Sequence, residues 1–346
     1  MASRFILLGV LSTAAVTAVA SAHVAPPLRA GGSTLITPVM RKWVSEYGTA
    51  TGASVDYASI GSGRGIAGMT DRSLDFGCTD APMNAAELQQ ADARGGVVVH
   101  VPLAMGAVAP IYNVPDVKTR LRFSGPVLAA IFLDRIQRWN DPALQALNPG
   151  TPLPDQAIGV VHRMDSSGTT YVWTDFLSRT SPAWAGEIGT GKTVAWPTGT
   201  SANGNEGVAG QVKLFPYSIG YAQLTYGIQE AVAYGAVENR AGAFIEPQPT
   251  AVTAAADASL TAIPDDLRFS ITDMPGNSSY PISAMTWALA YANQPDGKGS
   301  AIADFLSWVI HDGQRFNEPL HYAPLPAALV LRAEQKIDEL TAKQAH

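Results

Sequence analysis

The chain has 346 residues, of which 47% are hydrophobic and 15% are charged, with a formal net charge of −6. This length allows two domains, and the composition is that of a folded protein and not of a disordered one. The negative net charge argues against a nucleic-acid partner, because nucleic-acid binders normally present a basic face.

The N-terminus has the pattern of a secretory signal peptide. Arg4 precedes an apolar stretch from Phe5 to Val19, and Ala20 to Ala22 fit an A-x-A cleavage site. The stretch is short for a membrane span, which needs about 20 residues. We therefore expect residues 1–22 to be removed and the mature chain to begin at His23. No Cys follows the apolar run, so we expect no lipid anchor there.

The first third of the chain offers three turns that could line a ligand site. A turn carrying Ser33 and Thr34 opens a helical pattern, and a strand-like run to Ile60 leads into the glycine loop 61–65 and a helix expected over 66–70. The glycine loop completes neither a Walker motif nor G-x-G-x-x-G. A third strand-like run ends at Asp80, and ligands of open α/β sheets bind beyond the carboxyl ends of strands.

A fourth segment, Val161 to Thr170, has the chemistry of an anion site. Arg163 is followed by Asp165 and by a Ser-Gly-Thr turn that runs into an apolar helical pattern, with Ser167 or Thr169 as the expected N-cap. The start of a helix exposes unpaired N–H groups and a partial positive charge, and Arg163 would add a planar cation. Taken alone, however, such a turn is usually only a helix cap.

The remaining sequence indicates the fold class. Strand-like and helical patterns alternate, which predicts an α/β protein with parallel sheets. We expect helices over 299–310 and 327–341, and an irregular excursion over 246–264. The single Cys, Cys78, should be a buried core residue, and the six His have no metal-ligand spacing, so neither a metal nor a cofactor is expected.

The ordered set of motifs resembles a known family. The segments 30–43, 60–65, 76–82 and 163–169 are similar, in order and spacing, to the ligand loops of the periplasmic phosphate-binding proteins of Pst ABC transporters (the PstS family). Further matching stretches include Arg138 to Asp141, Gly204 to Val208 and Tyr280 to Ser283. The likeness extends over nearly the whole mature chain.

This resemblance implies a two-lobed, type II-like periplasmic-binding-protein fold, each lobe a mainly parallel sheet flanked by helices, with the ligand in the cleft. The first lobe would contain residues 23–104 and 280–346, and the second residues 105–279. The protein would be a periplasmic monomer without enzymatic activity. It would bind inorganic phosphate, close by a hinge and deliver its ligand to the transmembrane permease subunits of an ABC importer. The implied ligand residues are Thr34, Leu35, Ser62, Asp80, Arg163, Asp165, Ser167, Gly168 and Thr169.

Two positions depart from the family pattern. Leu35 stands where the family often has Phe, which matters little if only its N–H is used. Gly63 and Arg64 stand where Ser-Gly is common, which adds a cation near the rim of the pocket.

Two alternatives to phosphate capture stay open from the sequence. A binder of another oxyanion such as sulfate is disfavoured by Asp80, because a carboxylate can accept the proton that phosphate carries and sulfate lacks. A secreted phosphatase-like hydrolase would need a nucleophile or a metal at the phosphate, and no G-x-S-x-G motif is present.

Overall fold

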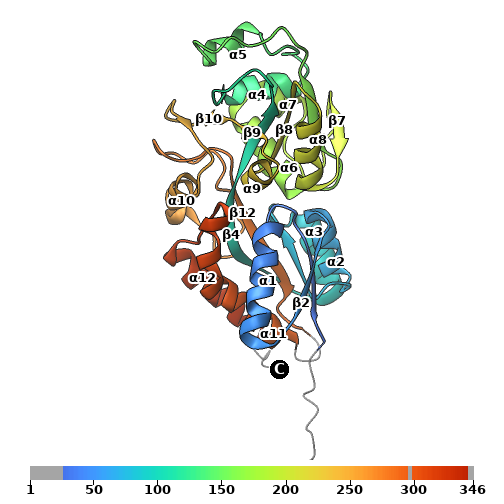
Figure 1. The fold of residues 1–346 in the computed structure, drawn as a ribbon. Coiled ribbons are helices and arrows are strands. Elements are labelled where there is room, and N and C mark those ends of the chain that lie inside the picture. The colour runs from blue at the N-terminus through green and yellow to red at the C-terminus, as the bar shows by residue number, and fades with distance from the viewer. Residues whose placement is uncertain (1–25, 295–297, 342–346) are drawn as a thin grey trace, which may run out of the picture.

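The computed structural model describes residues 26–294 and 298–341, and its helices and strands gather in two lobes (Figure 1). The expected signal peptide lies outside the described residues. Within these ranges, no helix has both the length and the apolar character needed to cross a membrane.

The first lobe is a mixed parallel and antiparallel sheet covered by helices. Its strands have the order β2-β1-β3-β12-β4, in which β1 is parallel to β2 and to β3, and β12 is antiparallel to its neighbours. The elements are β1 (Leu28–Gly32), α1 (Thr37–Thr51), β2 (Val55–Ser59), α2 (Ser62–Thr70), β3 (Phe76–Thr79), α3 (Ala85–Gly95), β4 (Val98–Asn113), β12 (Ser283–Tyr291), α11 (Lys298–Ile310), β13 (Tyr322–Ala323) and α12 (Ala327–Asp338).

The second lobe continues the same sheet in the order β4-β8-β6-β7, with β6 parallel to β7 and to β8. Its main elements are α4 (Gly125–Phe132), α5 (Pro142–Leu147), β6 (Gly159–Arg163), α6 (Gly168–Thr180), α7 (Pro182–Glu187), β7 (Thr200–Ala202), α8 (Gly204–Leu214), β8 (Ser218–Gln223), α9 (Leu224–Gln229) and β9 (Ala233–Tyr234). A small sheet of β5 (Arg122–Phe123), β10 (Ala236–Glu238) and β11 (Phe244–Ile245) completes it.

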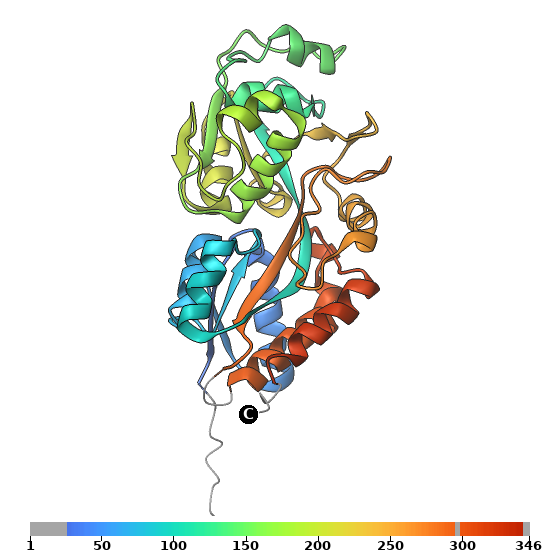
Figure 2. The same ribbon diagram turned by 180° about the vertical axis from the view of Figure 1, so that it is seen from behind.

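The long strand β4 connects the lobes (Figure 2). Its residues 98–107 pair with β12, and residues 108–113 pair with β8. Nearly every side chain of β4 is buried, as expected for a strand covered on both faces. The lobes therefore share one strand, and a hinge between them would have to bend β4 near residues 107 and 108, where its partner changes from β12 to β8.

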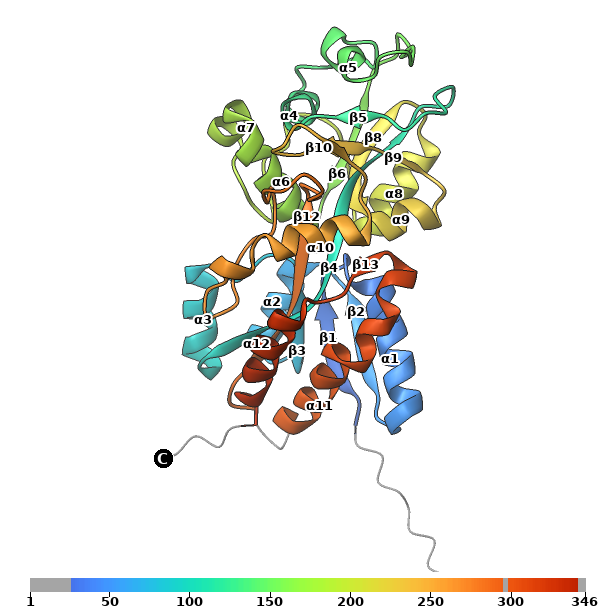
Figure 3. The same cartoon turned by 90° about the vertical axis from the view of Figure 1, so that its left-hand side faces the viewer.

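Two expectations about local structure are wrong. The region 246–264 is not irregular, because it contains α10 (Pro249–Asp257) and a short 3-10 helix, Leu260–Ala262. Helix α10 packs against β4 and β12 beside the connection between the lobes (Figure 3). The second correction concerns α2, which begins at Ser62 and not at residue 66, so that Ser62 lies in the first turn of a helix.

Candidate functional site

Arg163 ends β6 at a buried position and is held flat by a carboxylate. Its side chain is only 1% exposed, and its Nε donates to Asp165 Oδ1 at 2.7 Å while Nη2 donates to Oδ2. Burial alone would raise the pKa of Asp165, but the guanidinium holds that pKa below its ordinary value. In the described part of the chain, Nη1 of Arg163 is buried without a hydrogen-bond partner. The guanidinium of Arg163 therefore has one donor nitrogen, Nη1, that is not used within the protein.

The start of α6 supplies further donors beside Arg163. Ser167 is the N-cap, as expected, since its Oγ accepts from the Thr170 N–H at 3.0 Å. Among residues 26–294 and 298–341, the N–H groups of Gly168 and Thr169 have no partner. Unpaired N–H groups at a helix start favour an anion.

Asp80 follows β3 directly and is a buried acceptor, 2% exposed. Ser33 Oγ donates to both carboxylate oxygens at 2.6 and 2.7 Å, Thr286 Oγ1 donates to Oδ1 at 2.6 Å, and Ser62 Oγ lies 3.4 Å from Oδ2. Burial raises the pKa of Asp80 to about 6, although the hydroxyl donors and the nearby Arg163 oppose the shift. The carboxyl is therefore mostly ionised at pH 7 and gains a proton in mildly acidic solution.

Ser33 and Thr286 are not among the ligand residues implied by the resemblance. Ser33 lies within the first ligand segment, in the same turn as Thr34, so its position at the site was visible in the sequence. Thr286 is 206 residues from Asp80, and it reaches the carboxylate because β12 pairs with β3 in a register that puts Trp287 opposite Thr79. No local pattern in the sequence predicts this strand register.

The first ligand loop brings Thr34 and Leu35 into the same buried region. The Leu35 N–H donates to Ser33 Oγ at 3.0 Å, so its hydrogen is already engaged within the loop. Thr34 Oγ1 accepts from the Asn205 backbone N–H at 3.2 Å and from Asn205 Nδ2 at 2.7 Å. Asn205 belongs to the matching stretch Gly204 to Val208, but no pattern in the sequence assigns it a role.

The four ligand segments meet, and three glycines permit the contact. A Cβ added at Gly168 would lie 2.5 Å from Ser62 Oγ, one at Gly61 would lie 2.5 Å from Asp165 Oδ2, and one at Gly63 would lie 2.2 Å from Ser166 Oγ. The Gly63 N–H also donates across the cleft to the Ser166 carbonyl at 2.9 Å. The nine residues implied by the resemblance lie on the segments that meet here. Eight of them are buried and Asp165 is partly buried, whereas Arg64 is exposed on α2.

An ion pair at the mouth joins the lobes. Lys192 Nζ of the second lobe lies 2.6 Å from Glu87 Oε1 on α3 of the first, and these side chains are 14% and 21% exposed. The Lys192 carbonyl also accepts from the Ser167 N–H at 2.8 Å, which links the pair to the start of α6. Together with the contacts across the glycines, this pair defines a closed arrangement of the lobes.

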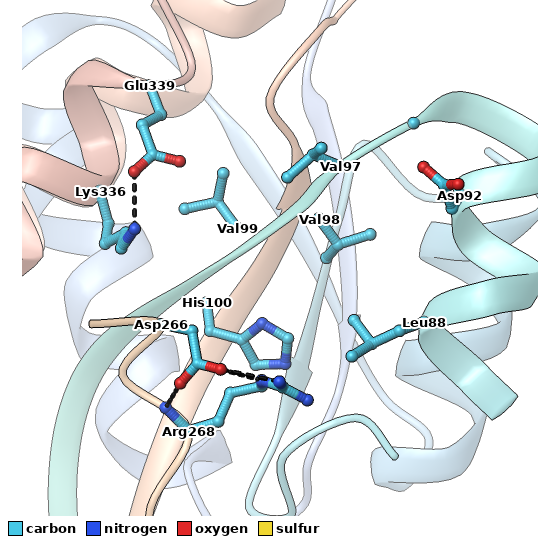
Figure 4. A pocket seen from close by; sticks show the side chains of 11 residues that line it. Leu88, Asp92, Val97, Val98, Val99, His100, Asp266, Arg268, Lys336 and Glu339 are labelled. Carbon is cyan, nitrogen blue, oxygen red and sulfur yellow. Dashed lines mark hydrogen bonds and ion pairs between the residues drawn. The ribbon is translucent and has the colours of Figure 1, made fainter. Parts of the chain in front are cut away.

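A separate cavity lies between α3, β4 and α12 of the first lobe (Figure 4). Its charged side chains are largely paired with one another, Asp266 with Arg268 and Lys336 with Glu339. Burial lowers the pKa of His100 to about 3, and its Nε2 accepts from the Met83 N–H at 3.3 Å. Among the described residues that line this cavity, no buried side-chain donor lacks a hydrogen-bond partner, unlike Nη1 of Arg163. Nowhere in the described ranges do three His, Cys, Asp or Glu side chains group so that they could hold a metal ion.

Comparison with known proteins assigns the family. Residues 17–312 match the model of the PBP superfamily domain. The phosphate-binding protein PstS of Xylella fastidiosa is 39% identical over 305 residues, which cover 88% of this chain and 82% of that protein. The chain belongs to the PstS family. A second member, from Pasteurella multocida, is 38% identical over 338 residues, covering 96% of this chain and 95% of its own.

The fold of the family is confirmed by a solved structure. A high-affinity periplasmic phosphate-binding protein, determined with phosphate bound, superimposes with a TM-score of 0.73 at 21% identity, covering 88% of this chain and 92% of that one. The two-lobed α/β fold expected from the sequence is therefore correct. The PstS family consists of binding proteins, which is not a class of enzyme.

Proposed function

We propose that this protein captures inorganic phosphate in the closed region between its lobes. The observation that carries the proposal is the combination of one unused Arg163 donor and one buried Asp80 acceptor in the same enclosed region. The proposed ligand residues are Thr34, Leu35, Ser62, Asp80, Arg163, Asp165, Ser167, Gly168 and Thr169.

Selectivity follows from the proton that phosphate carries near neutral pH. Hydroxyls, helix N–H groups and Arg163 would donate to its unprotonated oxygens, and the ionised Asp80 would accept its O–H. Sulfate offers only acceptors, so it would face Asp80 acceptor to acceptor. That mismatch costs a few kcal/mol, which is roughly a hundredfold or more in affinity.

The biological setting of the proposal rests on the family. The chain would be exported to the periplasm with loss of residues 1–22, act as a monomer, and deliver phosphate to the permease subunits of an ABC importer without catalysing a reaction. Residues 23–104 and 280–346 would move as one lobe and residues 105–279 as the other. The sharing of β4 between β12 and β8 supports a division within that strand.

Titration calorimetry tests the proposal on protein stripped of ligand by reversible unfolding and dialysis. Phosphate should bind tightly and sulfate should give no heat at about pH 8, while Asp80→Asn should lose much of this discrimination. Equal binding of both anions by the wild type would remove Asp80 from the site. If neither anion bound, the loops would only be helix caps, and turnover of a phosphate ester would be assayed next.

A further inference from the structure

Asn205 connects ligand residues from both lobes. It lies in the first turn of α8 and is completely buried. Its Nδ2 donates to Thr34 Oγ1 at 2.7 Å and to Thr169 Oγ1 at 3.0 Å, and its backbone N–H also donates to Thr34 Oγ1 at 3.2 Å. Its Oδ1 accepts from the Gln223 backbone N–H at 2.9 Å.

The Gln223 contact determines which way the amide of Asn205 points. The oxygen and nitrogen of an Asn side chain are assigned from their partners, and a backbone N–H can only donate. The atom facing Gln223 must therefore be Oδ1, and the two hydrogens of Nδ2 must face Thr34 and Thr169. Both threonine hydroxyls consequently accept from Asn205.

This acceptance leaves each threonine proton available. A hydroxyl has two lone pairs and one hydrogen, and both lone pairs of Thr34 Oγ1 are used by Asn205. Neither Thr34 nor Thr169 donates its hydroxyl hydrogen to any acceptor in the described part of the chain, and both side chains are at most 2% exposed. A buried donor without an acceptor is costly, so each of these two hydroxyl protons requires an acceptor.

We propose that Asn205 is a positioning residue that directs the hydroxyl protons of Thr34 and Thr169 at the bound phosphate, an inference that rests on the proposed function. One hydroxyl comes from each lobe, so Asn205 aligns this donor pair only when the lobes are closed. The pair selects unprotonated oxygens, while Asp80 selects the protonated one. Asn205 thus determines that both threonine hydroxyls donate to the anion, without itself contacting the anion.

A double-mutant cycle measured by phosphate calorimetry tests the proposal. Asn205→Ala should weaken binding roughly 10- to 100-fold, the range for one to two oriented hydrogen bonds to an anion. In a Thr34→Val/Thr169→Val background, which lacks the hydroxyls, the same change should alter the Kd by less than about twofold. A Thr34→Ser/Thr169→Ser background keeps the hydroxyls and should keep the full sensitivity.

A purely structural role for Asn205 predicts a different result. Its loss would then weaken binding by the same factor in every background, which would overturn the proposal. Asn205→Asp keeps the shape and the acceptor for Gln223 but turns Nδ2 into an acceptor, so it should bind phosphate at least as poorly as Asn205→Ala. Wild-type affinity in this variant would also refute the inference. If the wild type itself bound no phosphate, the proposed function would fail, independently of Asn205.

Discussion

Gly168 offers a direct test of whether the closed arrangement is the binding form. A Cβ at this position would lie 2.5 Å from Ser62 Oγ, 2.6 Å from Asp80 Oδ2 and 2.7 Å from Asp80 Cβ, whereas ordinary contact begins at 3.4 Å. Gly168 starts α6 in the second lobe, and the other two residues belong to the first. Gly168→Ala should therefore oppose closure of the lobes without disturbing the core of either one.

The magnitude follows from this overlap. Accommodating a displacement of nearly 1 Å in a packed region typically costs about 1–3 kcal/mol. Since the strain exists only in the closed form, the whole cost should be taken from binding, which weakens the phosphate Kd roughly 5- to 160-fold. The thermal midpoint of the ligand-free protein should hardly change, because the open form relieves the clash.

Calorimetry and thermal unfolding, with and without phosphate, measure both quantities. Gly210→Ala is the matched control, because it lies within α8 and a Cβ there would meet nothing within 4 Å. It should leave the Kd unchanged and stabilise the fold by about 0.5–1 kcal/mol. A folded Gly168→Ala protein with wild-type affinity would show that α6 does not approach Asp80 when phosphate is bound.

Three further predictions concern the carboxylate and the mouth of the site. Asp80 can donate a hydrogen bond to sulfate only when it is protonated. Sulfate affinity should therefore be negligible well above pH 6 and should rise as the pH falls through about 6, the pKa of that carboxyl. A sulfate Kd that does not change with pH in calorimetry would contradict this. Thr286→Val removes a donor to the carboxylate, so it should raise the pKa of Asp80 and move the onset of sulfate binding to higher pH, whereas an unchanged onset would count against the bond. Lys192→Met removes the ion pair with Glu87 and should accelerate phosphate release roughly 2- to 10-fold in stopped-flow fluorescence. The control Lys213→Met breaks an ion pair within the second lobe and should leave the release rate unchanged. Equal effects of the two variants would show that the pair between Lys192 and Glu87 does not hold the lobes closed.

Several features of the site were predictable because they are local in the chain. Arg163 and Asp165 are two residues apart on a strand end, so their ion pair needs little tertiary help. The N-cap at Ser167 and the position of Asp80 directly after β3 likewise follow from short patterns of polar and apolar residues. In each case, the residues that interact are neighbours in sequence.

The region 246–264 shows where pattern reading failed. Its Pro and Ala residues suggested an irregular segment, but Pro249 occupies the first turn of α10, where a missing N–H costs nothing, and the alanines are good helix formers. The buried residues Val252, Ala255 and Ala256 form the small face that packs near β4. A face made mostly of Ala gives a weak hydrophobic period, so the packing was not visible in the sequence.

The sequence by itself determined the family, the α/β class and the loops that carry the proposed ligand residues, because these depend on motifs and periodicities within short stretches. Only the tertiary structure decided how the polar groups of those loops are satisfied. Asp80 accepts a hydrogen bond from the Thr286 hydroxyl, and Thr34 accepts from Asn205, which is 171 positions away in the sequence. Such partners are set by strand register and by the closure of one lobe on the other, and neither leaves a local pattern in the chain.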